Sequence, residues 1–71
     1  MDIFVVIYHT EKGVVARATR APSASDAIGQ MAIWLVEEGL SEAHILACFA
    51  EVDVENMTAA IDEFKKEFQD V

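Results

Sequence analysis

Apolar and polar positions divide the chain into five segments of predicted regular structure. Residues 2–9 are apolar at every position from Ile3 to Tyr8 and rich in β-branched and aromatic side chains. A continuous apolar run of this kind is typical of a central strand that is covered on both faces. After a turn that ends at Gly13, residues 14–20 alternate more regularly and predict an edge strand, so that the two segments form a β-hairpin.

The rest of the pattern predicts a helix, a third strand and a second helix. Ser23 stands three residues before Asp26 in the arrangement of a capping box, which predicts a helix over residues 24–38 that ends at Gly39. Residues 44–52 are mostly apolar and predict a strand. Asp53 is expected to cap the second helix. Apolar residues recur along that helix at alternating spacings of three and four: Val54, Met57, Ile61, Phe64 and Phe68.

The resulting order, β-β-α-β-α, predicts a single α+β domain over residues 1–71. A right-handed crossover from the second strand to the third gives the strand order 2-1-3, which places the most apolar strand in the middle. We expect a two-layer fold, with both helices on one face of a three-stranded antiparallel sheet. Because the first and third strands are apolar on both faces, this arrangement leaves an open sheet face for a second copy of the chain or for a partner.

The first helix carries more apolar residues than one core-facing stripe requires. The face expected toward the sheet consists of Ala24, Ile28, Met31, Ala32 and Leu35. At about 100° per residue, Ile33 and Trp34 fall on the opposite flanks of the helix. One interpretation is that Ile33 and Trp34 point outward as apolar anchors for a partner. The other is that Trp34 folds over the edge of the sheet or is buried by the second helix.

The acidic residues are unevenly distributed along the chain. The 71 residues have a net charge of -8, which argues against nucleic-acid binding because phosphates require clustered Lys and Arg. Residues 1–36 carry three acidic and three basic side chains, whereas residues 37–71 carry ten acidic and two basic ones. Glu37, Glu38 and Glu42 cluster where the first helix ends. Such a cluster either steers the protein onto a basic partner surface or serves solubility alone.

A second acidic cluster is expected at the far end of the third strand. It consists of Glu51, Asp53 and Glu55. If the strand order is right, these residues and the cluster around Glu42 lie at opposite ends of that strand.

The residue types that carry catalysis or bind cofactors are not grouped in the sequence. The three glycines are isolated, and neither His9 nor His44 has a second ligand at metal-binding spacing. Cys48 has apolar neighbours, which predicts an unreactive thiol. We therefore expect a protein without enzymatic activity, cofactor or metal. A single cysteine and the absence of any long apolar run favour a cytoplasmic protein that does not enter a membrane.

Residues 14–46 resemble a small phage-encoded anti-CRISPR protein family directed at type I systems. The shared positions are V-V-x-R-A at Val14, Val15, Arg17 and Ala18, an alanine at Ala27, E-x-G at Glu37 and Gly39, and I-L at Ile45 and Leu46. These positions span less than half of the chain. The resemblance implies a stoichiometric inhibitor that binds a CRISPR surveillance complex and has no active site.

These observations lead to the expectation of a non-enzymatic protein that occupies a basic surface of a larger host complex. Ile33 and Trp34 are its expected apolar anchors. Glu37, Glu38 and Glu42 are the expected flanking charges. The alternative is a small homodimeric structural or accessory protein that uses the open sheet face as its interface.

Overall fold

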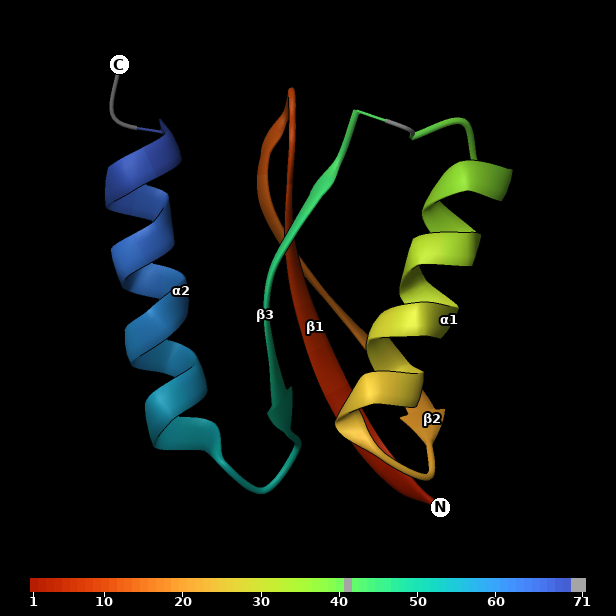
Figure 1. Cartoon of the computed structure of the whole chain (residues 1–71). Coiled ribbons are helices and arrows are strands. Elements are labelled where there is room, and N and C mark those ends of the chain that lie inside the picture. Colours follow the sequence, from red (N-terminus) through yellow and green to blue (C-terminus); the bar gives the residue numbers. More distant parts are fainter. Residues whose placement is uncertain (41, 70–71) are drawn as a thin grey trace.

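Three strands among residues 1–40 and 42–69 form one antiparallel sheet in the order β2-β1-β3. A computed structural model describes residues 1–40 and 42–69 of the chain. Its elements are β1 (Asp2–Thr10), β2 (Gly13–Ala21), α1 (Ala24–Glu37), β3 (His44–Ala50) and α2 (Val54–Gln69), as Figure 1 shows. The α+β class, the element order and the strand order are therefore confirmed.

The hairpin and the first helix form where their local signals predict them. Gly13 has a φ of 123° at the hairpin turn, a backbone conformation that favours glycine. The Ser23 hydroxyl accepts a hydrogen bond of 3.3 Å from the backbone N–H of Asp26. At the other end of α1, the N–H of Leu40 donates to the carbonyl of Leu35 at 2.8 Å, and Gly39 has a φ of 75°. This glycine-terminated end satisfies helix carbonyls that would otherwise lack partners.

The third strand is shorter than predicted. It ends at Ala50, whereas the apolar pattern predicted a strand through residue 52. The N–H of Asp53 donates to the carbonyl of Ala50 at 2.9 Å and closes a turn at this point. Val52 is 91% exposed in that turn, so its apolar side chain does not contribute to the sheet.

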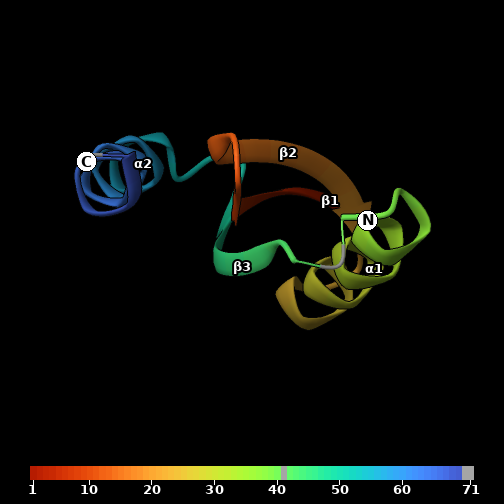
Figure 2. The same cartoon turned by 90° about the horizontal axis from the view of Figure 1, so that it is seen from above.

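The two helices lie on opposite faces of the sheet (Figures 1 and 2), and the expectation that both cover one face is wrong. Adjacent residues of a strand point to opposite faces. Tyr8 of β1 lies edge-on to Trp34 of α1, with ring centroids 6.5 Å apart. The next residue, His9, lies against Phe68 of α2, with ring centroids 4.9 Å apart. The fold therefore has three layers, with the sheet between α1 and α2.

Two physical features account for this arrangement. The middle strand is apolar on both faces, so covering each face removes apolar surface from water. Three strands spaced about 4.8 Å apart make a sheet of roughly 14 Å, which one helix of about 10 Å diameter nearly spans. The sheet face that was expected to remain open for a second copy or a partner is occupied by α2.

The buried core lies mainly between α1 and the sheet. It consists of Val6, Tyr8 and Ala21 from the hairpin and Ala27, Met31 and Leu35 from α1. On the α2 face of the sheet Ile7 is fully buried. The side chains that the structure describes on α2 include none that is buried, and Met57, Ile61 and Phe64 are half-buried. No helix in the described part of the chain has the length and apolar character needed to cross a membrane.

Candidate functional site

The end of the molecule where α1 leads into β3 gathers exposed carboxylates. Glu37 is the last residue of α1, Glu38 is its C-cap, and both are exposed. Glu42 is exposed in the segment that follows. The glycine-terminated end of α1 turns the chain here, so the predicted acidic cluster does form at one end of the fold.

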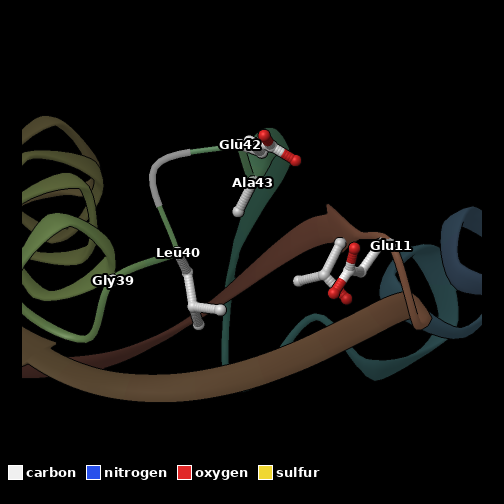
Figure 3. A pocket seen from close by; sticks show the side chains of 6 residues that line it. Glu11, Gly39, Leu40, Glu42 and Ala43 are labelled. Carbon is white, nitrogen blue, oxygen red and sulfur yellow. The ribbon is translucent and has the colours of Figure 1, made fainter.

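A fourth acidic residue joins this end from the hairpin turn. Thr10 and Glu11 line a hollow of about 150 Å³ together with Leu40, Glu42 and Ala43. Figure 3 shows Glu11 and Leu40 on different sides of this hollow, with Glu42 and Ala43 at its top. Sequence reasoning assigned Glu11 to the neutral half of the chain. Only the folding of the hairpin alongside α1 and β3 brings this carboxylate to the acidic end.

Trp34 is half-buried and packs against the core, so its expected outward orientation is wrong, whereas its expected role in partner binding stays a prediction. Its ring packs against Tyr8, and the Arg17 guanidinium carbon lies 4.0 Å from the ring centroid. The alternative interpretation, in which Trp34 folds over the sheet, is confirmed. A cation–π contact of this kind contributes about 0.5–1 kcal/mol where it is exposed to solvent.

The packing of Trp34 also changes which face of α1 meets the sheet. The buried residues of α1 are Ala27, Met31 and Leu35, whereas Ile28 is 39% exposed, contrary to its predicted place in the core-facing stripe. Ala24 and Ala32 are exposed as well. A tryptophan ring has more apolar area to remove from water than an isoleucine or alanine side chain. The helix is therefore turned toward Trp34 and away from Ile28.

The two most exposed large apolar residues of α1 are Ile33 and Val36. Ile33 is 63% exposed, as an anchor residue should be, and Val36 is 68% exposed. These residues lie three apart and so share one side of the helix. Sequence reasoning missed Val36, although its spacing from Ile33 and its place next to Glu37 were available signals.

The second acidic cluster lies at the opposite end of β3, as predicted. Glu51 and Glu55 are exposed and Asp53 is half-buried. Figure 1 shows the α1–β3 segment and the β3–α2 segment at the two ends of β3. The strand between them, H-I-L-A-C-F-A, contains no acidic or basic residue other than His44.

Cys48 and the two histidines lie outside these clusters. Cys48 is half-buried, and burial raises the pKa of its thiol, which disfavours the reactive thiolate. His9 and His44 are paired across β1 and β3, which sequence spacing did not indicate. Among the residues that the structure describes, no group of three or more His, Cys, Asp or Glu side chains is arranged to hold a metal ion.

No protein-family model, curated protein or solved structure matches the chain. The resemblance to anti-CRISPR proteins therefore stays a prediction from the residues that carry it. The exposed apolar and acidic residues at the end of α1 are the structural basis for a proposed function.

Proposed function

We propose that the chain is a non-enzymatic protein that binds a basic surface of a larger protein through the end of the molecule where α1 meets β3. The observation that carries this proposal is the continuity of exposed apolar and acidic residues there. Ile33 and Val36 are both more than 60% exposed, the carboxylates of Glu37 and Glu38 follow directly, and Glu42 lies in the segment before β3. Protein interfaces combine apolar anchors with a polar rim in this way.

The expected contribution of the carboxylates is mainly kinetic. Charges at an exposed rim speed the encounter of complementary surfaces, and salt screens this effect. The apolar side chains are expected to slow dissociation, because their removal from water is not screened. The proposal therefore assigns association to Glu37, Glu38 and Glu42 and retention to Ile33 and Val36.

An inhibitor of a host complex is the form of this function that the anti-CRISPR resemblance favours. A basic surface that evolved to hold a nucleic acid would also attract this acidic end. One molecule bound at such a surface excludes the nucleic acid by occupancy alone. The proposal accordingly requires no catalytic group, and the partner is a protein rather than a nucleic acid or a membrane.

The test is to compare two charge-reversed variants in the same binding assay. Glu37→Lys with Glu38→Lys reverses the α1 cluster, and Glu63→Lys with Glu67→Lys makes an identical change in net charge on α2. Proteins captured from a bacterial lysate by the wild-type chain are identified by mass spectrometry, purified and measured individually at low and high salt. We expect the first variant to associate about tenfold more slowly at low salt and the second to behave like the wild type. Unchanged affinity and salt dependence for the first variant would rule out the acidic contact.

A further inference from the structure

The sheet has two outer edges, and they differ in how they are protected from pairing with another chain. β2 carries Arg17 and Arg20 and is followed directly by Pro22. Charged residues and proline are common devices against unwanted edge pairing. β3 has neither device between His44 and Ala50, and no strand among residues 1–40 and 42–69 pairs with its outer edge. The outer edge of β3 is therefore the sheet's open position for a further strand.

An apolar groove lies between α1 and the first residues of this edge strand. Its volume is about 270 Å³, and its lining includes Ala32, Leu35 and Val36 of α1 together with Leu40 and Ile45. Val36 is 68% exposed, so the groove is open to solvent along its α1 side. A groove between a helix and an edge strand is the setting in which extended peptides add to a sheet, with alternate side chains entering the groove.

We propose that the outer edge of β3 binds an extended segment of the partner protein as a fourth strand, with apolar side chains of that segment in the α1–β3 groove and basic residues at both its ends. This inference rests on the proposed function and specifies the partner's chemistry. The backbone hydrogen bonds of the added strand supply affinity, and the groove selects its side chains.

The distribution of charge along β3 is the reason for basic residues at both ends of the segment. Glu42 precedes the strand and Glu51 follows it, and both are exposed. The strand between them has 7 residues without an acidic side chain. A segment of similar length with an uncharged middle and Lys or Arg at each end matches this order of charges.

The same charges argue against a second copy of the chain as the occupant. Antiparallel pairing of β3 with a symmetry-related β3 would bring Glu42 of one copy near Glu51 of the other, at both ends of the pair. Like charges in neighbouring strands destabilise the pairing. A second copy therefore meets repulsion at the positions where a basic segment meets attraction.

A synthetic peptide provides the direct test. The probe has the central sequence Thr-Val-Thr-Val-Thr, with two lysines at each end, and is titrated into the ¹⁵N-labelled full chain. We expect backbone amide shifts in two-dimensional NMR spectra to concentrate on residues 44–50 and on Ala32 and Val36. A peptide with N-methylated valines, which cannot donate strand hydrogen bonds, and one with glutamate ends should each bind about tenfold more weakly or less.

Matched variants distinguish peptide binding in the groove from binding elsewhere on α1. Val36→Lys places a charge in the groove. Gly29→Lys is the control, because Gly29 is exposed on α1, has open space for a side chain and lines a different hollow with Pro22 and Gln30. Both variants change exposed positions, and circular dichroism confirms that they fold. Val36→Lys should weaken peptide binding about tenfold, and Gly29→Lys should leave it unchanged. Glu42→Lys with Glu51→Lys should reverse the preference toward the glutamate-ended peptide.

Three outcomes would overturn this inference. The first is a lysine-ended peptide that shifts no amide of β3 at millimolar concentration. The second is equal weakening by Gly29→Lys and Val36→Lys. The third is sedimentation of the chain alone as a dimer whose interface amides are those of β3. None of these results depends on the Glu37 and Glu38 variant, so the proposed basic-surface contact is tested separately.

Discussion

The two faces of the sheet are both covered by a helix, but the helices pack to different depths. Between α1 and the sheet, the buried side chains are at most 5% exposed: Val6 and Tyr8 from β1, and Met31 and Leu35 from α1. Beneath α2, Ile7 is fully buried, while the helix's own Phe64 is only half-buried. The α1 face therefore forms the core, and the α2 face is a thinner second layer.

The composition of the strands explains much of this difference. The residues of β2 that share the α2 face with Val5 and Ile7 include Ala16 and Ala18, which are their register partners. Both alanines are exposed, although β2 is the strand that α2 approaches most closely. Small side chains offer α2 little apolar area to bury.

The α1 face and the α2 face therefore make unequal contributions to the free energy of unfolding. A chain of this length has a total stability of roughly 4–11 kcal/mol. Elements with few buried contacts open locally at lower free energy than the rest of the fold. We expect α2 to open first.

The largest expected effect is on the α1 face. Leu35→Ala removes a side chain that is 4% exposed and should reduce the free energy of unfolding by about 2–5 kcal/mol. The neighbouring Val36→Ala, at 68% exposure, should change it by less than about 0.5 kcal/mol. Urea denaturation followed by circular dichroism measures both values. Similar losses for the two variants would contradict the buried orientation of Leu35.

A smaller effect is expected on the α2 face. Phe64→Ala should cost about 1–2 kcal/mol, below the roughly 3–5 kcal/mol typical of a fully buried phenylalanine. Native-state hydrogen exchange should show faster exchange along α2 and unchanged protection of β1, because α2 opens without the α1 face. A loss as large as that of Leu35→Ala, or faster exchange throughout the sheet, would mean that the two faces are equally important.

The smallest expected effect concerns the edge of the α1 face. Arg17→Ala removes the guanidinium that lies 4.0 Å from the Trp34 ring centroid and should cost about 0.5–1 kcal/mol. The emission of Trp34, the single tryptophan, should move to longer wavelength as its ring gains water contact. Arg20→Ala is the matched control, because Arg20 pairs with Ile3 on the α2 face of the sheet. A spectral change of equal size in the control would place Trp34 elsewhere.

Structural features that depend on residues close together in the sequence were predictable. The apolar run from Ile3 to Tyr8 identified the central strand, and Ser23 and Gly39 identified the two ends of α1. The exposed positions of Glu37, Glu38 and Glu42 were predicted as well, because all three lie close to a single helix end. Such features follow from hydrophobic periodicity and from the backbone groups that a helix end leaves without partners.

The orientation of α1 and the composition of the acidic end were not predictable in the same way. Trp34 and Ile28 were misassigned and Val36 was missed, because helical periodicity defines faces relative to one another, but not which face meets the sheet. Glu11 joins the acidic end through a contact between segments that are far apart in the sequence. Position in the sequence does not indicate how close Glu11 lies to Glu42 in the folded chain.

The sequence by itself determined the five elements, their order and the strand order, because each follows from local pattern and from the handedness of one crossover. It also indicated that β1 has apolar side chains on both faces, so that both faces are stabilised by burial. Only the tertiary structure decided that α1 and α2 cover different faces and that Trp34 turns inward. It likewise decided that the outer edge of β3 lies beside an apolar groove. These outcomes depend on the width of a three-stranded sheet and on competition among side chains for buried area, and both arise only when the elements are assembled.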